Sequence, residues 1–586
     1  MSHPFTFYGT RSRLTTAEKS SGFLIELAPD SPRVKGVEHC HWPDELLGSA
    51  DDALRIANSV VSKLTEHVAT VTQFRLDTLE ESLLEQVSYS VQALRLDNWI
   101  SSRGISACRF DSYSPWLSRL RQIQNLTASP YDLNDTVPFG QRNWIQRGVL
   151  DLRRSMGRPA ELFRRVAPLW SRVLSSVPRR KSVRNAPHGG IWAYSTSYNY
   201  TKIALEYDDY FPQKINFLVE DPATGGKRLS ELGRDSYVVY AWSRASDIPS
   251  MSEVRRIGRN ITSAAASLAL GGDEAVLRTL LLKSEWWDHF LERTVPFLLF
   301  HERALQRWCD AVQPEMLVVG NAGWERSLLQ CDAAKQIPSV MLQHGIMHWV
   351  YAVADQPVTH FLVRGKFFQN LVNDKLRQKT IVCNHPEPIG PASPQNKSPR
   401  QGILFITMPY QIAPLFHSAD LHDILRCLLT VSHNCERQLL IRVHPLEKIS
   451  SYQRLVSEIQ QQSGFRCDVV YSQGPGAEEI LGRSCVAVLY FSTMFLDCLR
   501  HNIPIVSLDW HWFPNKSHFK EAKIFNFASD LRHLERLVQS AIEGRLPSCS
   551  ASLNDFLAPS RPEEIAQVLN DVWRSRPGSA SVVRRD

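Results

Sequence analysis

The sequence predicts an α/β protein with two Rossmann-like domains that face each other across a cleft. Three observations support this fold class. Short apolar runs alternate with helical patterns from residue 191 onward, which is typical of parallel βαβ units. A segment rich in Pro, Asn and Ser, residues 384–401, separates two such series. The 586 residues also exceed what one hydrophobic core supports, so several domains are expected.

These features divide the chain into five predicted segments. They are an N-terminal α/β portion (1–140), a basic amphipathic helical insertion (141–188), an N-terminal Rossmann-like domain (189–385), a C-terminal Rossmann-like domain (400–573) and a disordered tail (574–586). In the first segment, apolar runs predict strands, and helical spacing of apolar residues predicts two helices. The strands are Gly22–Ala28 and Ser106–Phe110, and the helices are Asp51–Val71 and Leu79–Arg103.

The two Rossmann-like domains each show strands followed by helices. For the first we predict strands Ile191–Tyr194, Ile215–Val219, Tyr237–Trp242, Glu315–Val319, Ser339–Leu342 and Thr359–Val363, with helices Tyr200–Tyr210 and Trp324–Lys335 and a long helical stretch over Ser252–Val312. For the second we predict strands Ile403–Thr407, Leu439–Val443, Val469–Tyr471, Val486–Tyr490 and Ile505–Leu508, with helices Asp420–Ser432, Tyr452–Gly464, Ala477–Leu481 and Thr493–Arg500.

The composition is that of a soluble globular enzyme, with 43% hydrophobic and 22% charged residues. Eleven cysteines without a CxxC pair indicate reduced thiols in a cytosolic protein rather than a disulfide framework or a zinc site. The first 30 residues contain no apolar segment typical of a signal peptide. No run of about eighteen apolar residues occurs, so we expect no membrane-spanning helix.

Residues 142–184 are strongly basic, with twelve Arg or Lys and two acidic residues among interleaved aromatic and aliphatic ones. This pattern favours an interfacial helix on an anionic membrane surface over an ordinary solvated insertion. Nucleic acid is not expected as a partner, because no recognised DNA- or RNA-binding motif accompanies the basic residues.

Three apolar runs end in residues suited to ligand binding. One ends in Gln343-His344-Gly345, one in Arg442-Val443-His444-Pro445, and one in Ser492-Thr493. Open α/β sheets bind ligands beyond the carboxyl ends of their strands. Three such ends on two sheets therefore predict one shared cleft, with a phosphate-bearing ligand as its natural occupant.

His444 is expected to be the last residue of its strand, since a residue before proline is pushed towards extended geometry. It could donate hydrogen bonds to a phosphate or protonate one, and Arg442, two residues earlier, could add positive charge on the same face. His344 could be a base, an acid or a phosphate ligand, and Gly345 permits close approach of the backbone. Each histidine could instead have a purely structural role in its loop.

Ser492 and Thr493 open a predicted helix, where they could cap the helix or bind a phosphate. Asp497, one turn later, could bind a ribose hydroxyl or complement the helix dipole. Glu220 and Asp221 follow a predicted strand; they could supply a general base or a carboxylate nucleophile, or form an acidic turn.

Another acidic pair, Asp208 and Asp209, is interpreted as a solvated helix end because no strand precedes it. No convincing DxD element is found, so no metal is implied.

These motifs resemble those of GT-B-type glycosyltransferases that build bacterial capsule and other surface polysaccharides, and of the related CDP-glycerol glycerophosphotransferases. The resemblance rests on Gln343-His344-Gly345, on Arg442-Val443-His444-Pro445, and on Ser492 to Asp497 followed by Asn502-Ile503-Pro504-Ile505, within residues 190–545. Two departures occur. Asn502 replaces the usual glycine, and Gln343 replaces a tryptophan common in the glycerophosphotransferases, which favours a sugar over glycerol phosphate.

The resemblance implies a metal-independent transferase without a bound cofactor that uses a nucleotide-activated sugar as substrate. His444, Ser492 and Thr493 would bind the donor phosphates and Asp497 the ribose. His344, or the pair Glu220 and Asp221, would take the acceptor proton. The implied partners are a nucleotide-sugar donor, a glycan or lipid-linked acceptor and the inner face of the cytoplasmic membrane. The alternatives are a CDP-glycerol-type polyol-phosphate transferase, a sugar-nucleotide epimerase and a non-catalytic binding protein.

Overall fold

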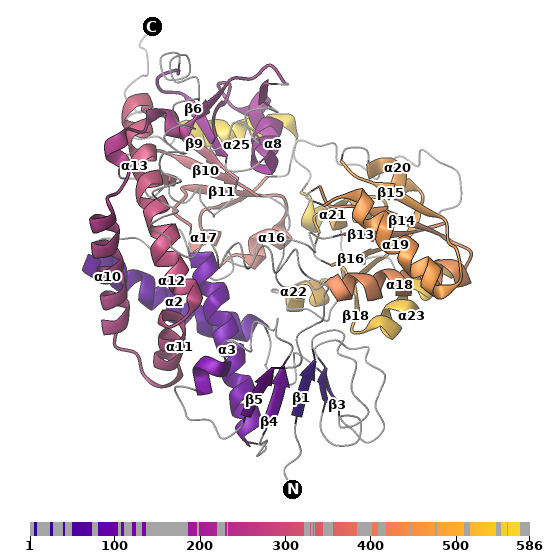
Figure 1. Cartoon of the computed structure of the whole chain (residues 1–586). Helices are drawn as coiled ribbons and strands as arrows, with labels where there is room; N and C mark the ends of the chain where they lie inside the picture. The colour runs from indigo at the N-terminus through magenta and orange to yellow at the C-terminus, as the bar shows by residue number, and fades with distance from the viewer. Residues whose placement is uncertain are drawn as a thin grey trace. The chain divides into compact units, whose positions relative to one another are not determined.

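The protein is described from a computed structural model (Figure 1). The structure describes residues 5–8, 24–26, 39–41, 50–72, 80–102, 107–110, 120–124, 132–135, 186–195, 198–219, 229–230, 232–320, 328–329, 332, 334–343, 356–383, 401–407, 418–445, 447–474, 477–490, 492–508, 516–546, 553–558 and 561–574. None of the helices in these ranges is long and apolar enough to cross a membrane. The basic stretch 142–184, the linker 384–400, the tail 575–586 and most of the predicted helix Trp324–Lys335 lie outside them.

The chain forms two compact units, each assembled from separate stretches. Unit 1 comprises Met1–Ala53, Val91–Pro138 and Pro388–Phe556, and unit 2 comprises Leu54–Ser90, Phe139–Glu387 and Leu557–Asp586. All strand pairs in the described residues are parallel.

The N-terminal part of unit 1 contains a five-stranded sheet of order β3-β2-β1-β4-β5. Its strands are β1 (Phe5–Tyr8), β2 (Leu24–Glu26), β3 (His39–His41), β4 (Ala107–Phe110) and β5 (Asp132–Asp135). Helices α2 (Ala50–Thr72) and α3 (Glu80–Ser102) lie between β3 and β4 in the sequence. The two predicted strands and both predicted helices of this portion are confirmed, whereas β1, β3 and β5 were not predicted.

Unit 2 contains a seven-stranded sheet of order β12-β11-β10-β9-β6-β7-β8. Its strands are β6 (Ile191–Ser195), β7 (Asn216–Val219), β8 (Ser236–Val238), β9 (Met316–Val319), β10 (Ser339–Leu342), β11 (His360–Val363) and β12 (Thr380–Val382). The first strand is central, and the chain builds outward on one side and then on the other. This order is that of a doubly wound sheet, with its switch point between β6 and β9.

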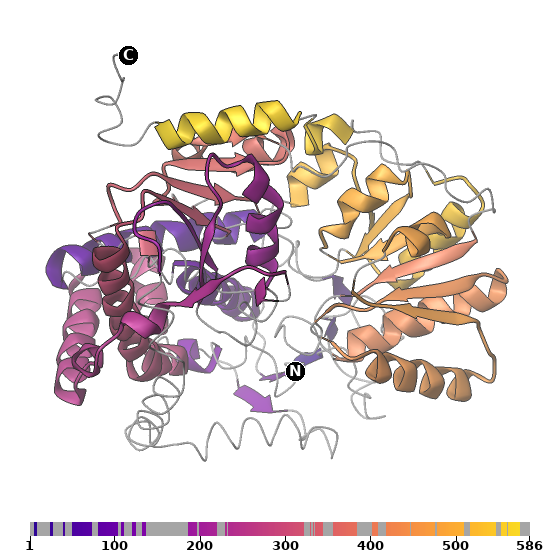
Figure 2. The same ribbon diagram turned by 90° about the horizontal axis from the view of Figure 1, so that it is seen from above.

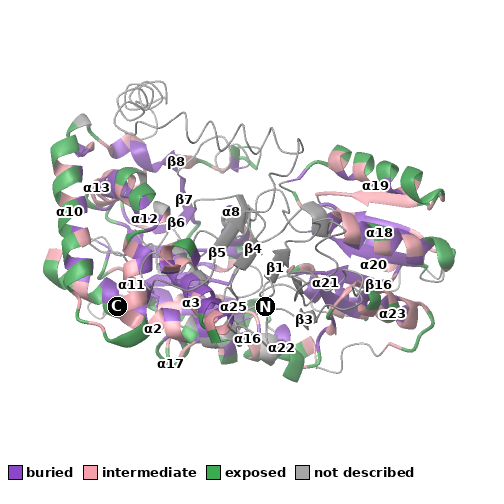
Figure 3. Ribbon diagram, turned by 60° about the horizontal axis from the view of Figure 1, so that its bottom comes forward, coloured by how far each residue is buried: buried purple, intermediate pink, exposed green. Residues whose placement is uncertain are grey.

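Helices surround this sheet. They are α8 (Tyr198–Tyr207), η3 (Asp208–Tyr210), η5 (Val239–Trp242), η6 (Ala245–Asp247), α10 (Met251–Ser267), α11 (Gly272–Leu282), α12 (Glu285–His289), η7 (Phe290–Thr294), α13 (Val295–Val312), α16 (Lys366–Leu371) and α17 (Asp374–Arg377). Trp192 of β6 packs edge-on against Trp308 of α13, with ring centroids 5.3 Å apart. Away from its buried residues α10 is exposed (green in Figure 3), and that face carries Arg256.

The predicted strand Tyr237–Trp242 is wrong in its second half. The strand ends at Val238, and residues Val239–Trp242 form the 3-10 helix η5. The turn in η5 lets the side chain of Tyr240 reach His301 on α13, to which its hydroxyl is hydrogen-bonded. This contact between distant segments outweighs the β propensity of the local sequence.

Unit 2 begins its sheet at a glycine pair. Gly189 and Gly190 both have φ of 73°, in the left-handed region that favours glycine. This geometry lets the carbonyl of Gly190 accept a hydrogen bond from the N–H of Glu315 (2.9 Å), next to the start of β9. The pair therefore aligns β6 beside β9.

Unit 1 also contains a six-stranded sheet of order β15-β14-β13-β16-β17-β18. Its strands are β13 (Gly402–Ile406), β14 (Gln438–Arg442), β15 (Val469–Ser472), β16 (Ser484–Leu489), β17 (Ile505–Leu508) and β18 (Asn526–Ala528). Its helices are α18 (Ser418–Asn434), α19 (Ile449–Ser463), α20 (Ala477–Gly482), α21 (Met494–Arg500), α22 (Lys516–Glu521), α23 (Leu531–Ile542) and α24 (Leu553–Phe556).

This sheet is buried on both faces, since all five residues of β13 are buried. Ile403 and Phe405 belong to the core formed with α18, α19 and α23, whereas Leu404 and Ile406 point to the other face. The strand order is the Rossmann order, with its switch point between β13 and β16. The predicted fold class, α/β with two Rossmann-like domains, is therefore confirmed.

The last helix, α25 (Pro562–Arg574), belongs to unit 2. Figure 2 shows it (yellow) lying along the strands and helices of that unit. Just before it, the N–H of Ala558 donates a hydrogen bond to the carbonyl of Arg364 at the end of β11 (2.8 Å). The chain therefore returns to the seven-stranded sheet after completing the six-stranded one.

Candidate functional site

Three segments of unit 1 leave neighbouring strands at the same sheet edge. Thr407 directly follows β13, His444 follows β14, and Ser492 and Thr493 follow β16. Because β14, β13 and β16 are adjacent and parallel, their carboxyl ends meet at the switch point of the sheet. This is the position at which open α/β sheets bind ligands. The candidate site is built from these three segments.

The backbone of His444 is held from two sides. Its N–H donates a hydrogen bond to Oγ1 of Thr407 (2.8 Å). Its carbonyl accepts hydrogen bonds from Nε2 of Gln473 (2.8 Å) and from the N–H of Glu447 (2.9 Å). The sequence predicted His444 as the last strand residue, but β14 ends at Arg442. The chain leaves the ladder because the His444 N–H bonds to a side chain and not to a neighbouring strand.

A buried polar cluster supports this segment. The carboxylate of Glu447, which is 5% exposed, accepts hydrogen bonds from the hydroxyls of Thr407 (3.2 Å) and Tyr452. Gln473 also donates from Nε2 to the carbonyl of Glu447 (2.8 Å). No role in the site was predicted from the sequence for the four residues of this cluster, which are Thr407, Glu447, Tyr452 and Gln473. The position of Thr407 directly after an apolar run was a usable signal, whereas Gln473 carried none.

The imidazole of His444 is half-buried, and burial lowers its pKa below the ordinary value of 6.5. It is therefore neutral at pH 7, with one donor and one acceptor nitrogen. An anion beside the ring would favour the protonated form and oppose the effect of burial. The arrangement is suited to a histidine that gains a proton when a phosphate binds.

Arg442 is engaged with the segment that follows β15. Its guanidinium donates hydrogen bonds to Oγ of Ser472 and to the carbonyl of Gly474. Burial lowers the pKa of Arg442, and the negative charge of Asp497 opposes that effect. Arg442 therefore joins β14 to the end of β15 while contributing positive charge close to Asp497.

Helix α21 carries the third segment, and Phe495 anchors it. The Phe495 ring packs edge-on against Phe519, Phe525 and Phe556, with centroids 5.6 to 6.0 Å from the last two. Thr493 is exposed, and its side chain makes no capping hydrogen bond. Oγ of Ser492 accepts a long hydrogen bond (3.4 Å) from the N–H of Met494. The capping role considered for Thr493 is therefore not observed.

Helix α21 ends beside one of the two positions where the sequence departs from the motifs that it resembles. Asn502 has a φ of 52°, in the left-handed region that favours glycine, the residue usual at this position of the motif that the sequence resembles. Its N–H bonds to the carbonyl of Leu499 (3.0 Å), and the N–H of Ile503 bonds to that of Cys498 (2.9 Å). These two bonds form a Schellman motif. Asparagine is among the few residues that tolerate this conformation, so it replaces glycine without loss of the turn.

In unit 2, the described residues stop at the edge of the second predicted motif. His344, Gly345, Glu220 and Asp221 lie outside the described residues. Gln343, which follows β10, is 4% exposed, and its Oε1 accepts a hydrogen bond from the N–H of Arg364 (2.8 Å). Its side chain therefore joins the ends of β10 and β11.

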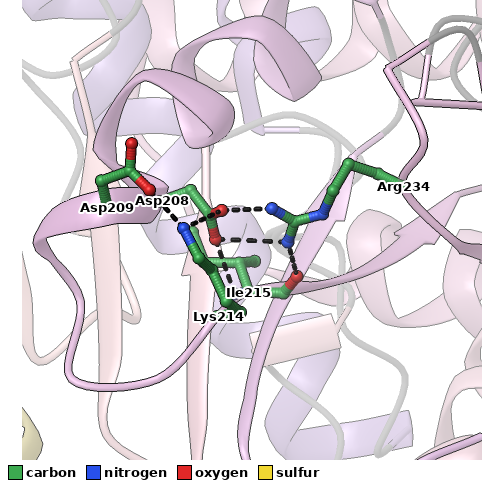
Figure 4. Close-up of polar contacts among 5 residues, drawn as sticks. All are labelled: Asp208, Asp209, Lys214, Ile215 and Arg234. Carbon is green, nitrogen blue, oxygen red and sulfur yellow. Dashed lines mark hydrogen bonds and ion pairs between the residues drawn. The ribbon is translucent and has the colours of Figure 1, made fainter.

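The interpretation of Asp208 and Asp209 as a solvated pair is wrong for the first residue (Figure 4). Asp208 is 4% exposed; it is paired with Arg234 and accepts a hydrogen bond from the N–H of Ile215 (2.7 Å). Asp209 is exposed and pairs with Lys214. Burial alone would raise the pKa of Asp208, but the hydrogen bonds from Arg234 and Ile215 and the nearby positive charges hold it below the ordinary value. Since these contacts fix the start of β7, the pair has a structural role.

A second buried polar group in unit 2 lies between α13, β6 and η5. His301 is fully buried, and its ring nitrogens hydrogen-bond the hydroxyls of Tyr194 (Nε2, 2.9 Å) and Tyr240 (Nδ1, 3.1 Å). Burial lowers the pKa of His301 to about 3. The ring is therefore neutral, and one tyrosine donates to it while the other accepts from it.

No protein-family model matches the sequence, and no curated protein matches it. The chain is similar to solved structures at low sequence identity. One is a UDP-GlcNAc 2-epimerase from Neisseria meningitidis bound to UDP-GlcNAc, with 10% identity and a TM-score of 0.40, covering 66% of this chain and 99% of that chain.

Two further solved structures are similar at comparably low identity. A glycosyltransferase from Rickettsia africae has 8% identity and a TM-score of 0.36, covering 67% of this chain and 95% of that chain. MurG from Acinetobacter baumannii has 9% identity and a TM-score of 0.36, covering 66% of this chain and 100% of that chain.

Proposed function

We propose that this protein is a GT-B-type glycosyltransferase that moves a sugar from a nucleotide-activated donor to a growing, lipid-linked bacterial surface polysaccharide. The observation that carries the proposal is the convergence of Thr407, His444 and Ser492 at the switch point of the six-stranded sheet. The imidazole of His444 and the hydroxyl of Ser492 can each bind a phosphate oxygen, while Thr407 holds the backbone of His444.

The donor would bind to the C-terminal Rossmann-like domain, residues 400–573. His444, Ser492 and Thr493 would bind its phosphates, and Asp497 would accept a hydrogen bond from a ribose hydroxyl. The hydrogen bonds that Arg442 makes to Ser472 and Gly474 would keep the neighbouring segment in place. Gly345 would allow the backbone of the other Rossmann-like domain, residues 189–385, to approach the substrates closely.

The reaction would break the bond between the sugar and the leaving phosphate and form a bond from the sugar to an acceptor hydroxyl oxygen. The proton of that hydroxyl would pass to His344 or to the pair Glu220 and Asp221. Negative charge develops on the departing nucleotide, and a hydrogen bond from His444 would stabilise it. Preorganised donors aimed at developing charge are commonly the largest single contribution to transfer catalysis.

A lipid-linked acceptor would require contact with the inner face of the cytoplasmic membrane. The basic stretch at 141–188 supports this part of the proposal, since twelve cationic residues between 142 and 184 would attract anionic lipid.

The proposal is tested by incubating the purified protein with CMP-, CDP-, UDP-, GDP- and dTDP-activated donors and measuring nucleotide release with and without a lipid-linked acceptor. We expect one donor to be used, slowly without acceptor and quickly with it. His444→Ala should lower turnover by about a hundredfold or more. The matched control is His518→Ala, which alters an exposed histidine on α22 and should leave turnover unchanged.

The same assay separates the other classes. An epimerase would convert its donor without any acceptor, and a polyol-phosphate transferase would release CMP from CDP-glycerol or a related donor. A binding protein would show no turnover, and its function would survive His444→Ala. Any of these outcomes would contradict the proposed sugar transfer.

A further inference from the structure

Arg364 is fixed at the carboxyl edge of the seven-stranded sheet, in unit 2. It directly follows β11, beside the end of β10. Its N–H donates a hydrogen bond to Oε1 of Gln343 (2.8 Å), and its carbonyl accepts one from the N–H of Ala558 (2.8 Å). Hydrogen bonds with two other segments of the chain therefore fix the position of the Arg364 backbone.

The guanidinium of Arg364 has a different environment from its backbone. The side chain is half-buried, and its Nε is fully buried without a hydrogen-bond partner. Among the described residues, no carboxylate forms an ion pair with it. Its charge acts on the Tyr207 hydroxyl, whose pKa is raised chiefly by burial and then by Cys383, while Arg364 opposes that rise.

An unpaired cation that is partly removed from water costs free energy, because its N–H groups lose hydrogen bonds to solvent. Two buried carboxylates of unit 2 avoid this cost. Asp208 is paired with Arg234, and Asp247 accepts two hydrogen bonds from Arg307 at 2.7 and 2.8 Å. Arg364 differs from them because no carboxylate in the described part of the chain pairs with it, although its backbone is held firmly.

The location and chemistry of Arg364 both suit an anionic ligand. Arg364 lies at the carboxyl edge of the sheet, the edge on which open α/β sheets bind ligands, although β10 separates β11 from the strands at the switch point. A guanidinium matches the two oxygens of a phosphate or carboxylate. The segment that contains the predicted acceptor-side residue His344 begins directly after Gln343, the residue that bonds to Arg364.

We propose that Arg364 binds an oxyanion of the acceptor, carried either as a phosphate or as a sugar carboxylate. The inference rests on the proposed function only in identifying the bound anion as part of the acceptor. The anion site itself would exist whatever reaction the protein catalyses. Gln343 is its positioning residue, since its amide oxygen fixes the backbone from which the arginine extends.

The test uses the full-length protein and isothermal titration calorimetry with inorganic diphosphate and, separately, with glucuronate. A His444→Ala background weakens diphosphate binding at the candidate donor site. In that background we expect one remaining anion site, and Arg364→Met should weaken it at least tenfold. Arg364→Lys should retain part of the affinity, because it keeps the charge but loses the planar fork. Tighter binding of diphosphate than of glucuronate would identify a phosphate-bearing acceptor, and the reverse order would identify an acidic sugar.

The matched control is Arg256→Met in the same background, which removes an exposed arginine of α10 and should change nothing. Thermal unfolding must show that the Arg364→Met protein is folded; if it is not, the comparison of Arg364→Lys with Arg256→Lys replaces it. Equal anion affinities in the Arg364 and Arg256 variants, or no anion binding in the His444→Ala background, would overturn the inference. The proposed transferase activity is measured separately, by nucleotide release, so either idea can fail without the other.

Discussion

The N–H of His444 donates a hydrogen bond to the hydroxyl oxygen of Thr407, 2.8 Å away. The bond joins the residues that follow two adjacent strands, β14 and β13, although they are 37 positions apart in the sequence. The position of the candidate phosphate-binding histidine therefore depends on a threonine that touches no ligand itself in the proposed mechanism.

Replacing Thr407 with valine should impair the site without changing its charge. The variant leaves the N–H of His444 and the carboxylate of Glu447 each short of one partner, so we expect a stability loss of about 1–3 kcal/mol. Turnover should fall about tenfold to a hundredfold as His444 moves. Thr407→Ser keeps the hydroxyl and should restore both, as measured by chemical denaturation and nucleotide release. Equal turnover in the valine and serine variants would show that the bond does not position His444.

Binding of a nucleotide diphosphate should take up a proton. Burial keeps the pKa of free His444 below 6.5, and a bound phosphate should raise it. Affinity should therefore fall as pH rises between the two pKa values, by at most about tenfold per unit. Titration calorimetry in two buffers of different ionisation enthalpy measures the proton uptake. His444→Asn should abolish it, and a wild-type affinity that does not change with pH would contradict the role of His444.

The ion pair of Asp208 with Arg234 should contribute to folding and not to activity. Arg234→Met leaves a buried carboxylate without its main partner, so we expect a loss of about 3–5 kcal/mol, partly recovered in the double variant with Asp208→Asn. Asp209→Asn, at the exposed neighbour, is the control and should have little effect. Urea denaturation provides the measurement, and equal losses for Asp208→Asn and Asp209→Asn would refute the assignment.

The low pKa of Asp208 also has a consequence for pH. The stability that the ionised carboxylate contributes is fully present above its unfolded pKa of 3.8 and is lost as pH falls through the still lower folded value.

His301 should make unit 2 sensitive to acid. The pKa of His301 is about 3 in the folded state and 6.5 in the unfolded state. Between these two values the histidine is protonated only in the unfolded chain, so the free energy of unfolding decreases as the pH is lowered. Because each pH unit below 6.5 costs about 1.36 kcal/mol, lowering the pH from 7 to 5 should cost about 2 kcal/mol. His301→Gln should flatten this part of the curve, whereas His188→Gln, at an exposed histidine, should not. Equal slopes in the two variants would exclude His301 as the source.

Asn502 should be replaceable by glycine but not by alanine. Alanine is disfavoured at the φ of 52°, which glycine adopts freely and asparagine tolerates through its short polar side chain. Asn502→Ala should therefore destabilise unit 1 by about 1 kcal/mol, whereas Asn502→Gly should be neutral or slightly stabilising. Asn260→Ala, at an exposed position inside α10, is the control and should not destabilise the protein. The alanine variants are compared by denaturant midpoint; a neutral Asn502→Ala would show that the left-handed turn carries no strain.

The central strands of the two larger sheets could be predicted because each is a continuous apolar run. Residues Ile403–Ile406 are buried on both faces of their sheet, and their composition alone indicates this. The edge strands Thr380–Val382 and Asn526–Ala528 were missed, since they are short and are formed by pairing with one neighbour. The ends of β14 and β16 could be predicted to within one or two residues, which singled out His444 and Ser492 as candidates.

The polar contacts could not be predicted in the same way. The burial of Asp208 depends on Arg234, and the placement of His444 depends on Thr407 and Gln473; each partner is distant in the sequence. Sequence periodicity reports which face of an element is apolar, but it contains no information on which distant polar group will lie beside it.

The sequence by itself determined the doubly wound α/β class and the strand ends that carry the candidate site, because hydrophobic periodicity and turn residues act locally. Only the tertiary structure decided that Thr407 holds His444, that Arg442 joins β14 to β15, and that Arg364 is a half-buried cation without an ion-pair partner among the described residues. The physical reason is that a buried polar group gains its stability from a particular partner, and the strand order of the sheets brings these partners together.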